Sequence, residues 1–404
     1  MAMRSDANGS ALTPALLLLM ALACGSMSAN LYYAQTLIDQ IGPEIGLSHQ
    51  MAGTITTLTQ LGYGAGLALL VPLSDLVENK RLVLIATGGA ILGCLGIALS
   101  GGAADFLAFS LLTGLCCCGA QVLVPLAAHL SAPERQGQSV GLVMSGLLTG
   151  VMLARPAASF IASLAGWRWV FFGSAGLLAV VALSLALMLP GRRPPRGPSY
   201  GAILASVVAL AARHRQLRLR AIYQALMFGA FNLFWTAAPL TLLNDMGLSQ
   251  RAVAAFALAG AGGVLVAPLA GWLSDRGLMR GTTLAGFAIL ALSFLAADAA
   301  VAAGSVLVFA VTAILVDGAV QMSQVTGQRI IFAIDPAARG RINAVYMTVM
   351  FGFGGLGSLI GTATYAAGGW HLSALAGAAM GGVALALMLA IDRPAKDGTA
   401  DCGG

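Results

Sequence analysis

Two charged side chains, Asp317 and Arg155, stand deep within long apolar stretches of this 404-residue sequence. A charge in a hydrocarbon environment is costly, so such residues are rare and usually functional. An acid in that setting can take up and release a proton, and a base can pair with it or hold an anion. We therefore expect Asp317 and Arg155 to carry the chemistry of this chain, with Asp317 as the proton-exchanging group.

Asp317 is the first residue of a polar stripe. Gln321, Gln324 and Gln328 follow it at i+4, i+7 and i+11, a spacing that places all four side chains on one face of an α-helix. Exposing four long hydrogen-bonding side chains to lipid would cost much free energy. The stripe predicts that this helix lines a central cavity, and the alternative is a structural hydrogen-bond network between helices.

Three other stretches carry weaker polar stripes with helical spacing. They consist of Ser26, Asn30 and Tyr33, with Tyr32 and Gln35 beside them; of Gln224, Phe228, Asn232 and Trp235; and of Thr113, Cys117 and Gln121. Each amide taken alone is also an ordinary packing group between helices. We expect the following to line the cavity together with Gln321 and Gln324: Asn30, Tyr33, Gln35, Gln121, Gln224, Asn232 and Trp235.

The role of Arg155 is open on sequence alone. Pro156 follows it and frees a helical carbonyl one turn back, which the guanidinium could bind. Arg155 could also extend to the membrane interface, pair with Asp317 in one conformation, or bind an anionic ligand.

The elements that position these residues are predicted from composition. The chain is 58% hydrophobic and only 9% charged, against about 25% charged residues in a soluble domain. Apolar runs of about 20 residues recur, each long enough to cross a ~30 Å hydrocarbon core as a helix. Period-2 alternation is missing, so strands are not expected. The sequence predicts an all-α integral membrane protein with twelve transmembrane helices at 12–37, 52–73, 82–100, 104–129, 139–164, 167–189, 217–242, 251–273, 281–300, 303–328, 342–365 and 370–391.

The basic residues indicate the orientation. With the N-terminus in the cytoplasm, all but three of the 21 Lys and Arg residues lie on the cytoplasmic side or in the cytoplasmic segments, the exceptions being Arg155, Arg168 and Arg251. This is the positive-inside pattern, and it predicts a multi-pass protein with both termini in the cytoplasm. The net charge of +6 follows from this topology and does not indicate a nucleic-acid partner.

Metal, cofactor and enzyme signatures are not found. Cys116, Cys117 and Cys118 are consecutive residues of a predicted helix and point in different directions, so they are not expected to bind a metal. The sequence has no phosphate loop, HExxH motif or nucleophile elbow, so we expect no catalytic residues, no cofactor and no enzyme activity. The segment 12–37 resembles a signal peptide in part, but its length and the eleven segments after it favour an uncleaved helix.

The chain repeats itself at an offset near 200 residues. "LSD" occurs at 73–75 and 273–275, "GLS" at 46–48 and 247–249, and "NLYY" at 30–33 corresponds to "NLFW" at 232–235. Ordered matches at a nearly constant offset indicate duplication, which is a transporter architecture. We expect two six-helix halves, 1–189 and 217–391, joined by a cytoplasmic linker at 190–216 with an amphipathic helix, and a cytoplasmic tail at 392–404.

The stretch "GWLSDRGLMR" at 271–280 resembles the loop signature of the major facilitator superfamily, G-x-L-(S/A)-D-R-x-G-x-(R/K), with Leu278 in place of the second Gly. The first-half copy "VPLSDLVENKR" keeps Leu73, Ser74, Asp75, Lys80 and Arg81. "GLLTGVMLARP" at 146–156 resembles the Gly-rich fifth-helix motif of the family's antiporters. The resemblance is strongest to bacterial drug and arabinose-efflux members of this family. It implies two pseudo-symmetric six-helix bundles, a monomer, and a location in the bacterial inner membrane.

The two loops also imply a conformational latch. An Asp at the end of a helix can accept hydrogen bonds from the N-terminal amides of a neighbouring helix, where the helix dipole favours an anion. By resemblance, Asp75 with Lys80 and Arg81, and Asp275 with Arg276 and Arg280, stabilise the state that is closed on the cytoplasmic side. The alternative is a pair of plain tight turns with solvated charges.

These features predict a secondary active transporter that exports a small organic solute by alternating access in exchange for protons. Its partners are then a small-molecule substrate, protons and membrane lipid. A uniporter or a proton-coupled importer of a sugar or other small polar metabolite is the first alternative. A membrane sensor or scaffold that does not translocate is the second, although the linker and tail are short for an output domain.

Overall fold

The computed structural model describes residues 12–48, 51–132, 135–191, 199–335 and 338–392. These residues form helices joined by short 3-10 or π turns, and no β-strand occurs among them. The prediction of an all-α membrane fold is confirmed. The elements are α1 (Pro14–Ala29), η1 (Tyr33–Thr36), α2 (Ile38–Glu44), α3 (Thr54–Leu69), η2 (Val71–Asp75), α4 (Asn79–Leu99), α5 (Ala103–Cys117), α6 (Ala120–Leu130), α7 (Gln136–Ala165), α8 (Trp167–Met188), α9 (Tyr200–Arg213), α10 (Arg215–Leu240), η4 (Thr241–Asp245), α11 (Gln250–Ala261), η5 (Gly262–Leu265), α12 (Val266–Asp275), α13 (Met279–Ala302), α14 (Val306–Phe332) and α15 (Arg339–Ile391).

Each of the twelve predicted segments contains helix, although only nine helices among the described residues are long and apolar enough by themselves to cross a membrane. Three features explain the difference. The first helix, α1, has 16 residues. The segment 251–273 is divided by η5 into α11 and α12. The last two segments form the single element α15, which bends at Gly368 and Gly369.

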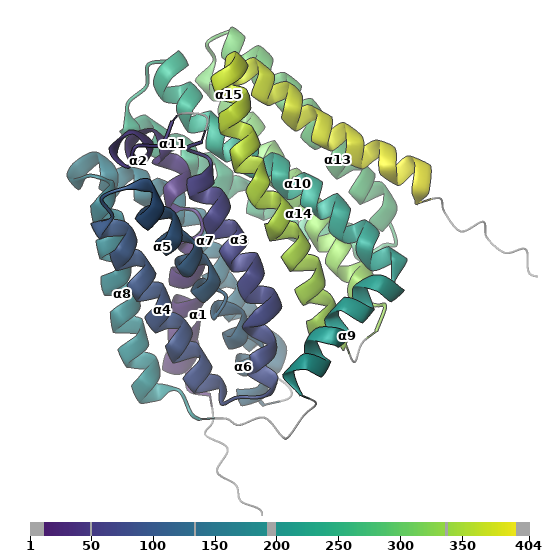
Figure 1. Ribbon diagram of the computed structural model, residues 1–404. Coiled ribbons are helices and arrows are strands. Elements are labelled where there is room, and N and C mark those ends of the chain that lie inside the picture. Colours follow the sequence, from purple (N-terminus) through teal and green to yellow (C-terminus); the bar gives the residue numbers. More distant parts are fainter. Residues whose placement is uncertain (1–11, 49–50, 133–134, 192–198, 336–337, 393–404) are drawn as a thin grey trace, which may run out of the picture.

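The bend in α15 depends on glycine. Gly369 has φ 62°, a left-handed conformation that glycine adopts without the steric cost of a Cβ. Figure 1 shows the consequence: α15 rises beside α3, turns at the top of the molecule and descends beside α13. One 53-residue element therefore supplies two antiparallel membrane segments with almost no loop between them.

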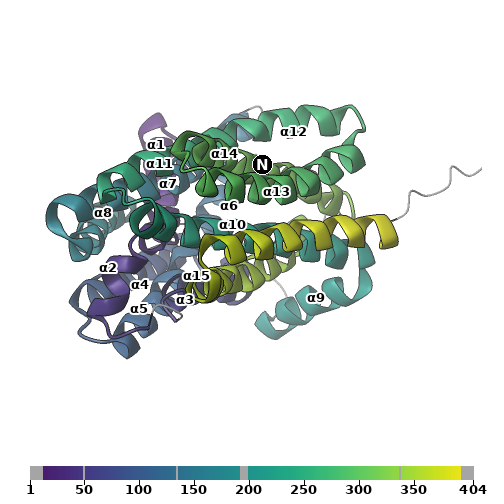
Figure 2. The same cartoon turned by 90° about the horizontal axis from the view of Figure 1, so that it is seen from above.

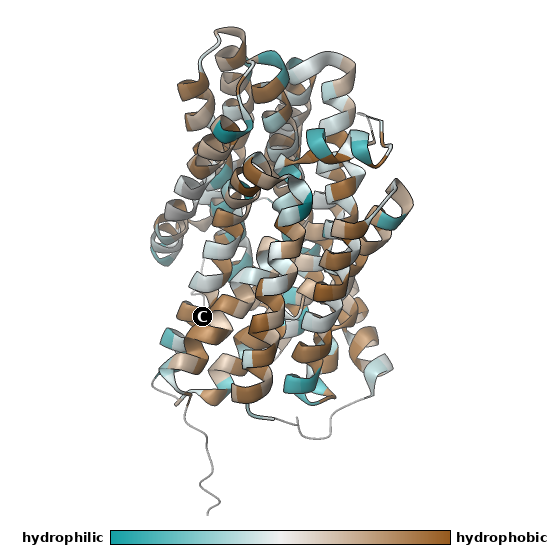
Figure 3. Ribbon diagram, turned by 90° about the vertical axis from the view of Figure 1, so that its left-hand side faces the viewer, coloured by the Kyte–Doolittle hydropathy of each residue, from teal (hydrophilic) through white to brown (hydrophobic). Residues whose placement is uncertain are grey.

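The surface of the helices is apolar. Leu187, Leu307 and Leu99 expose 79%, 77% and 73% of their surface, and in Figure 3 hydrophobic residues prevail along the helices while many hydrophilic residues lie toward the two ends. Large exposed apolar areas are unfavourable in water and favourable against lipid. The arrangement is that of a multi-pass membrane protein.

Helices α1 to α8 form one side of the molecule and α10 to α15 the other, with α11 reaching across to α7, as Figures 1 and 2 show. The two sides meet where α3 packs against α15 and α7 packs against α11. Close backbone approach at the first of these contacts is seen at Gly53, where an added Cβ would lie 2.4 Å from the carbonyl oxygen of Ser358. Small residues at helix contacts are typical of membrane bundles.

Two glycines of the Gly-rich segment at 146–156 serve the same purpose within the first side. A Cβ on Gly150 would lie 2.1 Å from the carbonyl oxygen of Gly25, and a Cβ on Gly146 would lie 2.3 Å from that of Ala21. No side chain fits at these positions unless α1 and α7 separate. The motif thus holds α7 against α1, and this contact fixes the position of Arg155 along the axis of the bundle.

The predicted amphipathic linker helix is present as α9. Ser199 caps it by accepting a hydrogen bond from the amide of Ala202, and Ile203 is its buried apolar contact. The Tyr200 hydroxyl donates to the carbonyl of Leu69 at 2.8 Å, and Arg341 donates to Ser206 at 3.0 Å. Since these bonds reach α3 and α15, α9 contacts both sides of the molecule. Residues 192–198 of the predicted linker and 393–404 of the predicted tail lie outside the described residues.

We call the end that carries α9 and η2 the linker end, and the end that carries α2 and the bend of α15 the opposite end. At the opposite end, Arg168 on α8 forms an ion pair with Glu44 on α2. The hydrogen bond from Arg168 holds the pKa of the Glu44 carboxyl below its usual range. This pair is partly exposed, so it mainly fixes the position of the short α2 segment.

Candidate functional site: a central cavity with one acid and one base

A cavity of about 400 Å³ lies between the two sides of the molecule, within the usual size range for small-molecule sites. Its walls are mainly aromatic and apolar, and include Tyr32, Phe228, Phe231, Phe351 and Met347. Of its described lining residues, Arg155 and Asp317 are the two that carry a charge. Both candidate charged residues therefore face the same cavity.

The polar stripe of α14 forms one wall of this cavity. Asp317, Gln321, Gln324 and Gln328 all line it, as their helical spacing requires. The Ser305 hydroxyl caps the start of α14 by accepting from the amide of Val308. Gln321, Gln324 and Gln328 present neutral hydrogen-bonding groups that can bind polar parts of a ligand without fixing its charge.

Asp317 is held by contacts from two neighbouring elements. The indole Nε1 of Trp235 on α10 donates to Asp317 Oδ1 at 2.7 Å. On the other side, an added Cβ on Gly263 would lie 2.3 Å from the Cβ of Asp317, and one on Gly260 would lie 2.9 Å from its Oδ2. The break between α11 and α12 therefore lets that backbone approach the carboxyl group closely.

Arg155 is bonded through only one of its three nitrogens. Its Nε donates to Gln35 Oε1 at 2.9 Å, and within the described part of the chain neither terminal nitrogen has a hydrogen-bond partner. The guanidinium carbon lies 4.8 Å from the ring centroid of Tyr32, 4.9 Å from that of Phe231 and 4.6 Å from that of Trp235. Three cation–π contacts thus hold the side chain, which is 96% buried.

Arg155 and Asp317 form no direct ion pair among the described residues. Both instead contact Trp235, which stacks against the guanidinium and donates its N–H to the carboxylate. The two charges still act on each other, because the surroundings contain little water to screen them. The geometry is that of an acid and a base separated by one indole ring.

A row of buried amides connects Arg155 to the second side of the molecule. Gln35 accepts from Arg155 and donates through Nε2 to Asn232 Oδ1 at 2.6 Å, and Gln60 donates to the same oxygen at 3.4 Å. Asn232 in turn donates to the carbonyl of Phe228. Gln35 and Gln60 belong to the first side and Asn232 to the second, so these bonds hold the two sides together.

Further contacts close the molecule toward the opposite end. The Thr57 hydroxyl donates to the carbonyl of Gly355 at 2.6 Å, the amide of Gly53 donates to Thr362 at 3.1 Å, and Gln250 donates to the carbonyl of Thr36 at 3.0 Å. Toward the linker end, by contrast, the cavity adjoins a second one of about 430 Å³ lined by η2, α9 and the start of α15. The central cavity is therefore accessible from the linker end and closed at the opposite end.

Replacing Asn232 by Leu is expected to weaken closure at the opposite end by about three- to five-fold. The substitution removes the acceptor shared by Gln35 and Gln60, and one buried hydrogen bond contributes about 0.6 to 1 kcal/mol. The measurement is the distance between spin labels placed on α2 and α11 in the purified protein. Thr236→Val is the matched control, because Thr236 lies one turn away and bonds to Ser358 within its own side; an equal change in both variants would contradict the expectation.

The other predicted cavity residues lie in three kinds of place. Gln121 lines the cavity and donates to the Tyr63 hydroxyl at 3.0 Å. Gln35, Asn232 and Trp235 lie just behind the lining, in the bonds described above. These three do not line the cavity itself, and three further predicted residues do not line it either: Asn30, which bonds to Ser174 and Cys94; Tyr33, which packs on Phe171; and Gln224, which is fully buried.

Several residues of the site were missing from the predicted set. Tyr32 and Phe231 flank Arg155, and Gln60 completes the amide row. Tyr32 lies beside the first of the weaker polar stripes but is not among the expected lining residues, and Phe231 directly precedes Asn232 of another stripe. Gln60 lies in a stretch with Thr56, Thr57 and Thr59, a polar density that could have drawn attention to this helix. No group of three metal-ligating side chains occurs within the described ranges.

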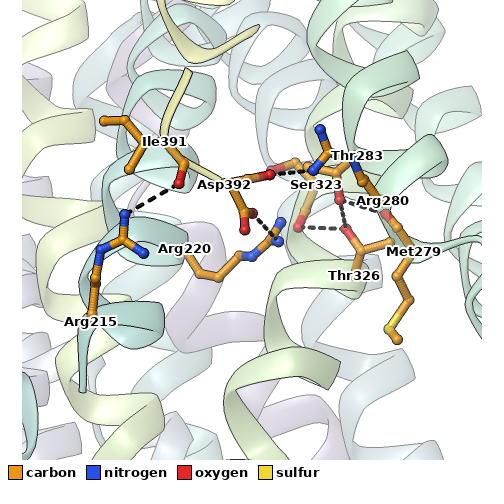
Figure 4. Close-up of polar contacts among 9 residues, drawn as sticks. All are labelled: Arg215, Arg220, Met279, Arg280, Thr283, Ser323, Thr326, Ile391 and Asp392. Carbon is orange, nitrogen blue, oxygen red and sulfur yellow. Dashed lines mark hydrogen bonds and ion pairs between the residues drawn. The ribbon is translucent and has the colours of Figure 1, made fainter. Parts of the chain in front are cut away.

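At the predicted latch, the second-half residues are engaged within their own side. Asp275 pairs with Arg329 on α14, and Arg276 lies over the Trp272 ring at 3.7 Å. Arg280 donates to the backbone carbonyl of Asp392, as Figure 4 shows. The same figure shows that Arg220 pairs with the Asp392 carboxylate and Arg215 with the carbonyl of Ile391. Three arginines thus bind the C-terminal end of α15, where the helix dipole favours cations.

The first-half latch residue Asp75 lies in the second cavity, whose opposite wall includes the start of α15 at Arg339 and Gly340. It has no ion-pair partner in the part of the chain that the structure describes, and none is seen for Lys80 or Arg81. Closure of the linker end would bring Asp75 toward the N-terminal amides of α15. This placement agrees with a latch that is open in the described conformation.

We expect Asp75→Asn to slow cycling several-fold without preventing ligand binding, because the residue lies outside the central cavity. Asp275→Asn should have the same kind of effect through its contact with Arg329. Transport rate and equilibrium binding are measured on the same preparation of each variant. Complete loss of binding in either variant would show that the loop supports the cavity itself rather than the closed state.

Comparison with known proteins identifies relatives over most of the chain. The model of the Major Facilitator Superfamily matches residues 16–325 and 220–401. An uncharacterized transporter of Escherichia coli O157:H7, YgaY, is 40% identical over 368 residues, which are 91% of this chain and 93% of that protein. A probable transporter of Streptomyces coelicolor is 33% identical over 367 residues, 89% of this chain and 84% of the relative.

The fold is also found among solved structures. The structure of the nucleoside transporter NupG superposes with a TM-score of 0.74 over 93% of this chain and all of that chain, at 15% sequence identity. At that identity the likeness concerns the arrangement of the helices. The solved structure therefore supports the fold, while the family rests on the matches in sequence.

Proposed function

This chain belongs to the major facilitator superfamily and is a membrane transporter. We propose that it is a secondary active transporter that exports a small organic solute in exchange for protons. We further propose that the linker end faces the cytoplasm of a bacterial cell, in the inner membrane. The halves 1–189 and 217–391 would then move as two six-helix bundles about the cavity, in a monomer, with 190–216 as the cytoplasmic linker and 392–404 as the tail.

One observation carries this proposal: among the described residues that line the cavity, one buried acid, Asp317, and one buried base, Arg155, lie on either side of Trp235. A carboxyl group changes its proton affinity when its exposure or its neighbouring charge changes. Alternating access changes both, so the two states hold the proton with different strength. That difference couples proton movement to cargo movement.

Export is supported by the conformation and by the Gly-rich segment. The cavity is accessible from the linker end, so cargo would enter it from the cytoplasm under the proposed orientation. Gly146 and Gly150 pack α7 on α1 within the segment that resembles the antiporters of this family. The cation-rich linker end also agrees with the positive-inside rule.

A second candidate function, uptake of a small polar metabolite together with protons, is favoured by one observation. The two terminal nitrogens of Arg155 have no partner among the described residues, and a cation in a cavity attracts an anion. Anion and proton would then be carried in the same direction. The two candidates differ in the sign of the coupling, which can be measured.

The test is a screen of solutes in proteoliposomes that contain the purified full-length protein, with an imposed pH gradient and a dye that reports internal pH. A solute moved in exchange for protons changes internal pH in the opposite sense from a solute moved with them. Internal pH that responds to no solute, in liposomes where binding is measurable, would contradict proton coupling. Movement of solute without any pH change would indicate a uniporter.

A further inference from the structure

Among the described residues, the two terminal nitrogens of Arg155 form an edge without a hydrogen-bond partner. The Nε position is taken by Gln35, so the side chain cannot rotate that nitrogen into the cavity without breaking the bond. Rings of Tyr32, Phe231 and Trp235 pack around the guanidinium. A ligand must therefore approach the planar group through its remaining edge, which carries both Nη atoms.

Among the described residues, that edge forms no direct ion pair. Asp317 bonds to Trp235 instead of to Arg155, and at least one terminal nitrogen of Arg155, Nη2, is fully buried without a partner in the described part of the chain. An unsatisfied buried donor of a charged group is costly. A planar fork with two donors matches the two oxygens of a carboxylate, which can bind both at once.

We propose that the cargo is a small organic monocarboxylic acid, bound as its anion with its carboxylate on the Nη1–Nη2 edge of Arg155 and its apolar body against the aromatic wall. The proposal rests on the proposed function in one respect, that the central cavity is the cargo site. It adds the chemical class of the cargo, and a cargo of that class favours the second candidate function, movement together with protons.

The other residues that line the cavity narrow the chemical class of the cargo further. Arg155 is the one cation among the described lining residues, so a second carboxylate would find no partner and would lie near Asp317. Phe228, Phe231, Phe351 and Met350 offer an apolar surface, while Gln321 and Gln324 can bond to a neutral polar substituent. An amphipathic acid with one charge fits these walls, and a dicarboxylate or an organic cation does not.

The class of cargo also determines the sign of proton coupling. An anion on Arg155 adds a negative charge close to Asp317, so an ionised Asp317 opposes its binding and a protonated Asp317 does not. Acid and proton then load together, as in a symporter. The charge of the cargo therefore decides between the two candidate functions above.

The test compares acids with their own amides. Acetate, hexanoate, phenylacetate and indole-3-acetate, and the four matching primary amides, are titrated calorimetrically into the purified full-length protein in lipid nanodiscs. Each pair has nearly the same shape and differs in charge. We expect at least one of the larger acids to bind about ten-fold or more tightly than its amide, the ratio that charge-assisted hydrogen bonds supply.

Two variants assign the preference to this site. Arg155→Gln should remove the preference for the acid over the amide while the amide still binds, which shows that the cavity is intact. Asp317→Asn leaves the Arg155 edge in place and removes the opposing charge, so it should bind the acid more tightly than the wild type does, by up to roughly ten-fold at a pH where Asp317 is ionised. If Arg155→Gln does not fold, Arg155→Lys replaces it; Lys keeps the charge but loses the second donor of the fork, and acid binding should weaken.

The proposal is overturned if no acid binds, if acids and amides bind equally, if the preference survives in Arg155→Gln, or if Asp317→Asn binds the acid more weakly. These results can be separated from failure of the proposed function. A neutral or cationic solute transported with an Asp317-dependent proton flux would leave that function standing without this cargo. An acid that binds to Arg155 and is not moved across the liposome membrane would establish the site and contradict transport.

Discussion

Asp317→Asn is expected to abolish uphill transport driven by a pH gradient while ligand binding and exchange across the membrane continue. Asn keeps the size and most of the hydrogen bonding of the side chain, including an acceptor for the Trp235 indole, but it cannot exchange a proton. The proton affinities of the two states then no longer differ, and the gradient no longer supplies free energy. Accumulation in proteoliposomes and equilibrium exchange are measured for the same preparation.

Asp298→Asn is the matched control for this variant. Asp298 is an acid on α13 that pairs with His371 near the opposite end, away from the cavity, so its neutralisation should leave accumulation unchanged. Accumulation by Asp317→Asn at the wild-type rate would show that Asp317 does not couple proton movement. Since no other acid lines the cavity within the described residues, the uniporter would then become the leading function.

Arg155→Lys is expected to lower the transport rate about ten-fold or more although the charge is kept. Lys has no Nε donor in the right place for Gln35, so the link from the cavity to Asn232 is lost. It also lacks the planar fork that stacks between aromatic rings. Hydrogen bonds to charged groups contribute about 1.5 to 3 kcal/mol, which corresponds to the stated loss if one such bond is made only in the active conformations.

The rate is compared with that of Arg168→Lys, a change of the same kind at the opposite end, where Arg168 pairs with Glu44 outside the cavity. That control should transport as the wild type does. Wild-type transport by Arg155→Lys would mean that charge alone matters at this position. Because Arg155 also connects to the amide row, the variant should show a change in kcat as well as in KM.

The polar face of α14 was predictable because it is a local property of the chain. A spacing of four and seven residues places side chains on one side of a helix whatever surrounds it. Asp317, Gln321 and Gln324 therefore line the cavity as expected. The same spacing describes Asn30 and Gln224, which lie in interiors of the helix bundle, because periodicity groups residues on a face without stating what the face contacts.

Sequence patterns could not predict the contacts between segments that are far apart in the chain. Gln35 bonds to Arg155 and Asn232, which lie 120 and 197 residues away, and nothing local to Gln35 indicates either partner. The break at η5 has a weak local signal in Gly260, Gly262 and Gly263. Glycine is common in membrane helices. These residues alone therefore did not show whether the segment forms one continuous helix or is interrupted between α11 and α12, next to Asp317.

The position of Trp235 gives the protein a native optical reporter. Its indole lies against the Arg155 guanidinium and donates its N–H to the Asp317 carboxylate, so charges on both sides act on one chromophore. The excited state of an indole has a larger dipole than its ground state, and its emission therefore shifts when a neighbouring charge appears or disappears. With the four other tryptophans of the chain replaced by Phe, emission from Trp235 alone would follow proton and cargo binding in real time, without a label.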